Sequence, residues 1–376
     1  TLLGGNMRPH RGHILAGVAI TILTFLFIAC EGKKEQVAKP TDAIKASIVP
    51  NADFAASVDL EAIRNTPACK DFAKDNDTAK EITTESGKAQ SATGQLDEIQ
   101  KITGLSVNDV ASVLVSADLN TLDIGGEGGE PDMSKAIGVL AVQLSKPLPN
   151  AKLVEAAKAV AAKDNNGTAE AIQVAGQTVV RLSAKDGDDP DLFVASGPGE
   201  QTVFMAPNTA SLEGVLKRAK NGEFSSVPVE LETLRKALPP GAQFKLAFLT
   251  PPKLREVVQE QIDKAKKDPD ATMLAGMVVP FKDLQSLAVG VECGEDLKVG
   301  IGSDLGSPEG ANKVATMLET MVLPMATGAI AKWTGKDPQE VSDRFDIKAD
   351  GKALKVEVQL SQKDIELMQK SNDQEK

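Results

Sequence analysis

The chain presents one order of expected strands and helices twice, and this constrains its fold more than any single motif. One strand is expected to begin near Phe54, after Val49-Pro50-Asn51, and another near Phe244, after Leu238-Pro239-Pro240. Apolar residues in alternation predict strands, and apolar residues three or four positions apart predict the helices between them. The shared order is β-α-α-β-β-α-β-β-α, and the first half adds two strands over 192–195 and 202–205.

This order predicts an α+β fold of two related halves, each an antiparallel sheet with helices packed mainly on one face. Each half contains a hairpin with glycine at its turn, at Ala175-Gly176 and at Asp350-Gly351. Identity between the halves is low, so a chance similarity of order is the alternative. The expected divisions are a leader over 1–30, a tether over 31–45, a first half over 46–235, a second half over 236–370 and a disordered tail over 371–376.

The first thirty residues have the organisation of an export signal. Arg8 and Arg11 precede an uncharged apolar run over 14–29, which ends in Ala29 directly before Cys30. Positive charge, an apolar run and a small residue at the processing site are typical of a signal peptide. The run has 16 residues, fewer than the roughly 20 that a helix needs to cross a bilayer. We therefore expect a leader that is removed.

The stretch Leu26-Phe27-Ile28-Ala29-Cys30 resembles the lipobox of bacterial lipoproteins, in which a signal peptidase cuts before a cysteine that becomes diacylated. Phe27 stands where that motif usually has an aliphatic residue. The resemblance implies a lipid on Cys30 that attaches the protein to the membrane. Glu31, in place of the aspartate that often marks inner-membrane retention, favours the outer membrane, facing the periplasm. An ordinary cleaved leader is the alternative.

The segment that follows the tether carries a second, shorter resemblance. Pro50-x-Ala52-x-Phe54, with Ser57-Val58-Asp59-Leu60, is similar to the start of exported bacterial lipoproteins of unknown function. The similarity covers about fifteen residues and implies no activity.

Missing residue types exclude most enzyme classes. Both histidines, His10 and His13, lie in the leader, and the chain contains no tyrosine and a single tryptophan, Trp333. Without histidine there is no Ser-His-Asp or Cys-His catalytic unit and no imidazole ligand for a metal. We expect a protein that is not an enzyme and uses no cofactor or metal. A hydrolase that relies on carboxylates alone is the remaining catalytic alternative.

The net charge argues against nucleic acid as a partner. The chain has 42 basic and 53 acidic residues. The leader holds two of the arginines and no acidic residue, so the remainder has 40 basic residues and a net charge of −13. Nucleic acids and anionic lipid headgroups require basic surfaces that neutralise them.

Two cysteines remain besides Cys30. Cys69 and Cys293 lie in opposite halves, and an even number of cysteines in an exported protein is compatible with a disulfide between them. Two buried free thiols are the alternative.

Methionines at helical spacing are the one candidate binding feature. Met317, Met321 and Met325 lie four residues apart, and Met273 and Met277 repeat this spacing earlier in the chain. Methionine adapts to irregular apolar partners, so these residues are a possible face for a hydrophobic ligand or a partner protein. The alternative is that they belong to the core.

The sequence as a whole favours a membrane-anchored envelope lipoprotein without catalytic activity, which binds another envelope component or has a structural role. The second hypothesis is a carrier that holds a lipid or another hydrophobic ligand between the sheet and the methionine-rich helices.

Overall fold

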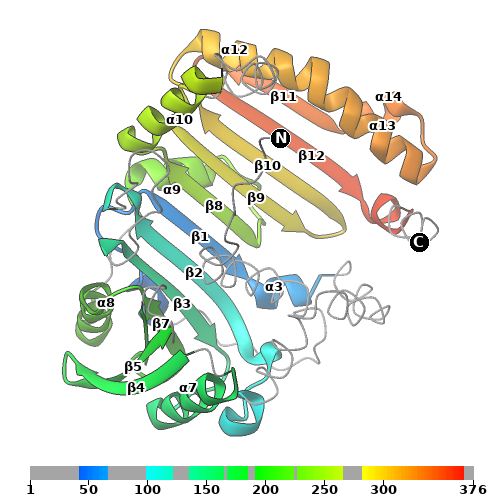
Figure 1. Cartoon of the computed structure of the whole chain (residues 1–376). Helices are drawn as coiled ribbons and strands as arrows, with labels where there is room; N and C mark the ends of the chain where they lie inside the picture. The colour runs from blue at the N-terminus through cyan, green and yellow to red at the C-terminus, as the bar shows by residue number, and fades with distance from the viewer. Residues whose placement is uncertain are drawn as a thin grey trace, which may run out of the picture.

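The computed structural model describes residues 42–66, 99–121, 135–164, 167–184, 191–223, 227–265 and 282–367. In this part of the chain twelve strands form one antiparallel sheet, in the order β11-β12-β10-β9-β8-β1-β2-β3-β7-β6-β5-β4 (Figure 1). The α+β class predicted from the sequence is confirmed. The expectation of a separate sheet in each half is wrong, because all twelve strands belong to the same sheet.

The elements are bounded as follows. The first seven strands are β1 (Phe54–Asp59), β2 (Val110–Asp118), β3 (Ile137–Leu144), β4 (Gly167–Val174), β5 (Gln177–Ala184), β6 (Leu192–Ser196) and β7 (Thr202–Ala206). The other five are β8 (Phe244–Leu249), β9 (Ser286–Cys293), β10 (Asp296–Asp304), β11 (Phe345–Asp350) and β12 (Ala353–Ser361). The helices and helical turns that precede β8 in the chain are α2 (Asp42–Lys45), α3 (Leu60–Arg64), η1 (Val107–Asp109), η2 (Leu119–Thr121), α7 (Asn150–Asp164), α8 (Thr209–Asn221) and α9 (Val229–Lys236). Those that follow are α10 (Pro252–Ala265), α12 (Pro308–Met317), η5 (Leu318–Val322), α13 (Leu323–Thr334) and α14 (Pro338–Ser342).

A seam between β1 and β8 joins the two parts of the sheet. Ala55 of β1 lies opposite Ala247 of β8, and both side chains are buried. Backbone hydrogen bonds extend the seam beyond the strands, since the Leu249 N–H donates to the Asp53 carbonyl at 2.7 Å. The two strands expected to begin near Phe54 and Phe244 therefore pair near the centre of the sheet. They run antiparallel, so Phe54 lies opposite Phe248 and Phe244 lies opposite Val58.

The order of elements is similar on the two sides of this seam. The strands that follow β1 outward are β2 and β3, and those that follow β8 are β9 and β10. In both parts the third strand leads into a helix, α7 or α12, and then into a hairpin at the edge of the sheet, β4–β5 or β11–β12 (Figure 1). β6 and β7, the two strands predicted as additions to the first half, lie between β3 and β5, whereas β12 pairs directly with β10.

Helices cover both faces of the sheet. Phe193 and Ala195 of β6 pack in one core cluster with Leu212 of α8. Val194, between them in sequence, packs in a second cluster with Leu153 of α7. Because successive strand residues point to opposite faces, α7 and α8 lie on opposite sides. The expectation that helices pack mainly on one face is therefore wrong for the first part of the chain.

Local turn and cap chemistry explains the elements that the sequence predicts best. Gly351 adopts a φ of 54° between β11 and β12, and Ala175 and Gly176 adopt 51° and 75° between β4 and β5. Two-residue hairpin turns require such positive values, which glycine reaches at no steric cost. α12 begins with the Ser307 hydroxyl accepting a hydrogen bond from the Gly310 N–H and with Pro308 in the first turn.

Candidate functional site

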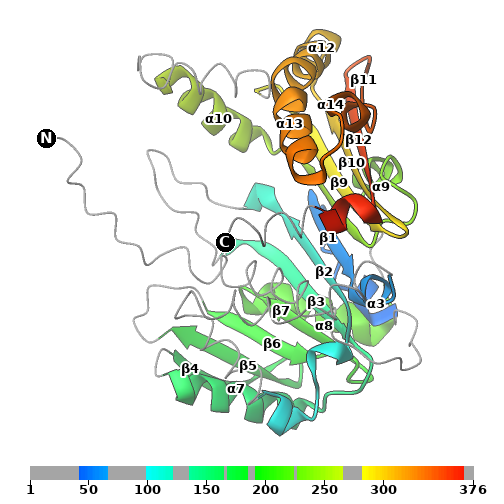
Figure 2. The same ribbon diagram turned by 90° about the vertical axis from the view of Figure 1, so that its right-hand side faces the viewer.

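The candidate site lies on one long helix near the β11 edge of the sheet. α12, η5 and α13 form a continuous helix over Pro308–Thr334 (Figure 1, Figure 2). α12 holds this helix on the sheet through its buried residues Ala311, Val314 and Ala315, which pack in a cluster with Leu354 of β12. The helix is therefore a fixed part of the folded domain at its N-terminal end.

A π-helical turn over Leu318–Val322 separates α12 from α13. Pro324 follows it and has no N–H to donate to the carbonyl four residues earlier, and its ring crowds that carbonyl. A wider turn accommodates a proline within a helix. The extra residue of the turn rotates the faces of α13 relative to those of α12. In α13 the buried residues are Thr327, Ala331 and Thr334, and the helix packs against α14.

The other face of α13 and its preceding turn is apolar and exposed. Met325 is 77% exposed, Met321 45%, Val322 42% and Trp333 40%. We call these four residues the apolar face. Met321 and Val322 precede Met325 by four and three residues, and Trp333 follows it by eight, spacings that place them along one side of a helix. The twelve residues over 320–331 contain no charged side chain. An exposed apolar surface of this kind is typical of an interaction site.

Among the helices in the described ranges, this one alone is long and apolar enough, by length and composition, to cross a membrane. Of its most apolar 18-residue window, 22% is buried. Because α12 packs on the sheet, the helix over Pro308–Thr334 belongs to the folded domain. Its apolar outer side is therefore a surface of that domain.

The structure describes three of the five methionines that the sequence singles out. Met321 and Met325 lie on the apolar face, whereas Met317 packs against the core cluster beneath α12. Met273 and Met277 lie outside the described residues. Val322 and Trp333 were not predicted as site residues, although Trp333 stands eight residues after Met325 and could have been found by extending the helical spacing.

The predicted cysteine sites are only partly described. Cys30 and Cys69 lie outside the described residues, so lipidation and the disulfide stay predictions. Cys293, at the end of β9, is a half-buried free thiol in the structure. Burial raises its pKa, and the neighbouring carboxylate of Glu292 raises it further.

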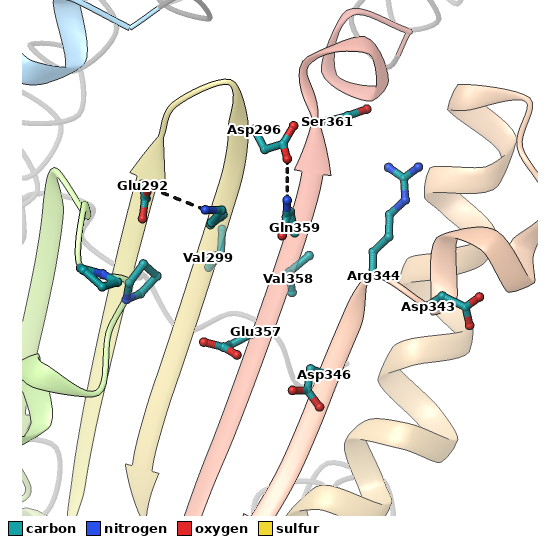
Figure 3. Close-up of a pocket in the computed structure, with 13 residues that line it drawn as sticks. Glu292, Asp296, Val299, Asp343, Arg344, Asp346, Glu357, Val358, Gln359 and Ser361 are labelled. Atoms are coloured by element: carbon teal, nitrogen blue, oxygen red, sulfur yellow. Dashed lines mark hydrogen bonds and ion pairs between the residues drawn. The ribbon is translucent and has the colours of Figure 1, made fainter.

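A groove lies on the face of the sheet opposite to α12. It has a volume of about 620 Å³ and is open to solvent, and its floor is formed by β9, β10, β12 and β11 (Figure 3). Glu357 lines it, while Val356, the preceding residue of β12, packs beneath α12. The ionisable residues that line it are Glu292, Asp296, Lys298, Asp343, Arg344, Asp346 and Glu357.

Several of these side chains already interact with one another. The Gln359 side-chain amide donates to Asp296 at 2.5 Å, and Lys298 Nζ lies 3.8 Å from Glu292 Oε1 (Figure 3). Arg344 pairs with the buried carboxylate of Asp364. Within the described ranges no group of three or more acidic, cysteine or histidine residues could hold a metal ion. We therefore take the apolar face, and not this groove, as the candidate site.

No protein-family model, no curated protein and no solved structure matches this chain. The site is therefore interpreted from its own chemistry.

Proposed function

We propose that the protein is a lipid-anchored component of the bacterial cell envelope, without catalytic activity, that binds another envelope component through its apolar face. The exposure of Met325, with Met321, Val322 and Trp333 beside it, carries this proposal. Soluble proteins rarely leave a contiguous apolar surface uncovered unless it meets a partner. The leader that ends at Cys30 supports the anchor and the location, which we take to be the outer membrane facing the periplasm.

The absence of histidine after the leader supports a role that is not enzymatic. Nucleophilic catalysis generally uses a neighbouring base, and histidine is the commonest. The groove on the other face holds carboxylates, and those of Glu292 and Asp296 already have partners within it.

The carrier hypothesis is the weaker alternative. A carrier needs an enclosed apolar cavity of several hundred Å³, whereas the groove of about 620 Å³ is open and lined mainly by polar side chains. Native mass spectrometry of the protein would favour the carrier if it showed a lipid-sized excess of mass that denaturation removes.

We also infer that the two parts of the sheet arose as related halves. The support is the common order of three strands, a helix and an edge hairpin on each side of the β1–β8 seam. The apolar face belongs to the helix that corresponds to α7 in the first half. α7 is followed directly by its hairpin, whereas α13 continues the second helix beyond the π-helical turn.

Two measurements in the native envelope test the proposed function. Metabolic labelling with palmitate should label the protein and should fail for Cys30→Ser, which tests the anchor. A photo-crosslinking residue at position 325 should capture a component of the envelope. The same residue at position 229, where Val229 is 75% exposed on α9, serves as the control. Capture at 229 and not at 325 would contradict the proposed binding face.

A further inference from the structure

We infer that the apolar face binds the surface of a phospholipid bilayer, so that the protein meets its own membrane both through the lipid on Cys30 and through α13. This inference rests on the proposed function for the anchor, and names the envelope component that the apolar face contacts.

The first argument is the chemistry of the helix surface. From Met321 to Trp333 the apolar face extends over twelve residues, about 18 Å along a helix, with no charged side chain before Lys332. A folded protein partner usually offers polar groups that require polar counterparts, and before Lys332 no exposed residue of this stretch has a polar side chain, because Thr327 is buried. A helix with one side of this kind can lie in the plane of a bilayer with its apolar side among the acyl chains.

The second argument is the pair of residues at the end of the helix. Trp333 is the only tryptophan of the chain and is exposed beside Lys332. Tryptophan concentrates at the level of the lipid headgroups, because its ring is apolar and its N–H is polar. Lysine extends its charged end toward water from the same depth. The two residues therefore suit the boundary of a bilayer, with Met321, Val322 and Met325 on the apolar side.

The third argument is the length of chain between the anchor and the fold. The described structure begins at Asp42, twelve residues after Cys30. Even fully extended, twelve residues span at most about 40 Å. A lipid on Cys30 would thus hold the domain near the membrane without fixing its orientation. Surface chemistry then decides which side meets the bilayer, and the uncharged apolar face is the side that acyl chains accept.

The net charge narrows the type of lipid. A net charge of −13 after the leader opposes binding to an anionic surface. Zwitterionic lipid is therefore the expected surface, and vesicles of phosphatidylcholine are the appropriate probe.

Trp333 makes the test direct, because all tryptophan fluorescence of the protein comes from this position. The full-length, membrane-extracted protein is placed in phosphatidylcholine vesicles with or without bromine on the acyl chains. We expect a blue shift of the emission in vesicles and a loss of roughly half its intensity to the brominated lipid, as for a tryptophan at the interface. Met325→Asp should abolish both effects, while Val229→Asp, at a position of nearly equal exposure, should keep them.

The possible outcomes separate the inference from the proposed function. If the protein is palmitoylated but Trp333 is neither shifted nor quenched in vesicles, the bilayer contact is wrong and the anchor stands. If Cys30→Ser abolishes membrane association in the cell, but Trp333 of the soluble protein is still quenched by added brominated vesicles, the bilayer contact is supported independently of the lipid anchor. A blue shift without lipid that disappears on dilution would show a second copy covering the face, and would overturn the inference. Urea unfolding midpoints of Met325→Asp and Val229→Asp equal to that of the wild type exclude loss of the fold as the cause.

Discussion

Pro239 lies directly on the backbone of Gly300, so closely that a Cβ atom at residue 300 would stand 2.6 Å from Cδ of the proline. On the neighbouring strand, a Cβ atom at Gly290 would stand 2.9 Å from Cβ of Leu238. These two glycines of β9 and β10 allow the segment after α9 to cover the sheet at van der Waals distance. The same segment forms one wall of the groove, through Pro239 and Pro240.

Gly300→Ala should therefore destabilise the protein by about 1–3 kcal/mol, because an added methyl group would overlap the proline ring. Gly302→Ala is the matched control on the same strand and face. Its Cβ would lie 3.8 Å from Cβ of Ala237, an ordinary contact. The control should be neutral or slightly stabilising, since alanine restricts the unfolded chain more than glycine. Urea unfolding followed by circular dichroism measures both, and equal losses would refute the close contact.

Asp364 should be the most sensitive carboxylate of the C-terminal part. It is fully buried, pairs with Arg344, lies 2.6 Å from Lys336 Nζ and accepts a hydrogen bond from the Ser361 N–H at 3.0 Å. Asp364→Asn removes the charge that compensates both cations. We expect a loss of about 1–3 kcal/mol in the free energy of unfolding.

Asp346→Asn is the control for that variant. Asp346 pairs with Lys348 at 2.5 Å, but both side chains are exposed. Exposed ion pairs contribute little to stability, so this variant should unfold close to the wild type. A comparable loss in both variants would show that the burial of Asp364 does not matter.

Two buried aspartates should give opposite pH dependences. Burial raises the pKa of Asp109, but hydrogen bonds from Ser106 and Lys146 together outweigh it and hold the pKa below its ordinary value. Burial raises the pKa of Asp53, and its hydrogen bond from the Leu119 N–H only partly offsets this. A depressed carboxyl pKa stabilises the fold above the ordinary value and loses this contribution as the pH falls through the folded-state pKa. A raised pKa has the opposite sign, because the folded state then binds the proton more readily.

The stability advantage of the wild type over Asp109→Asn should therefore shrink between about pH 5 and pH 2. For Asp53→Asn we expect the reverse: the free energy of unfolding of the wild type, relative to that of the variant, should increase as the pH falls. Urea unfolding of the three proteins across this range gives the two slopes. Slopes of the same sign would contradict the environments that the structure gives these carboxylates.

The sequence predicts what local chemistry determines. The hairpins at Ala175-Gly176 and Asp350-Gly351 each depend on a few adjacent residues. The β1–β8 seam was not predicted, because it pairs segments nearly two hundred residues apart and no residue at the seam marks its partner. The faces covered by helices were also missed, since alternation shows that two faces differ but not what covers each.

The candidate site shows the same limit. Methionine spacing predicted a stripe but left open whether it was core or surface, since periodicity is the same in both. The structure packs the partly buried Met317 against the core and leaves Met321 and Met325 exposed. The π-helical turn before Pro324 changes the helix phase between them, and a regular helical period does not include such a turn.

The thiol of Cys293 provides a test of the environment at the end of β9. Its pKa is raised by burial and by Glu292, so the reactive thiolate is scarcer than in an exposed cysteine. In reduced protein, iodoacetamide should alkylate Cys293 slowly at neutral pH and rapidly after unfolding. Glu292→Gln should raise the rate roughly two- to fivefold, because one of the two causes of the shift is removed.

Glu295→Gln is the matched control for this reaction, since Glu295 is exposed two residues further on and does not contribute to the raised pKa. Peptide mapping by mass spectrometry follows Cys293 separately from Cys69. Equal rates for the two glutamine variants would rule out Glu292 as a cause of slow alkylation. The same mapping of exported protein without reductant tests whether Cys69 and Cys293 form the disulfide that the sequence leaves possible. A bond between Cys69 and Cys293 would leave both unlabelled until reductant is added, whereas labelling after unfolding alone would show two free thiols.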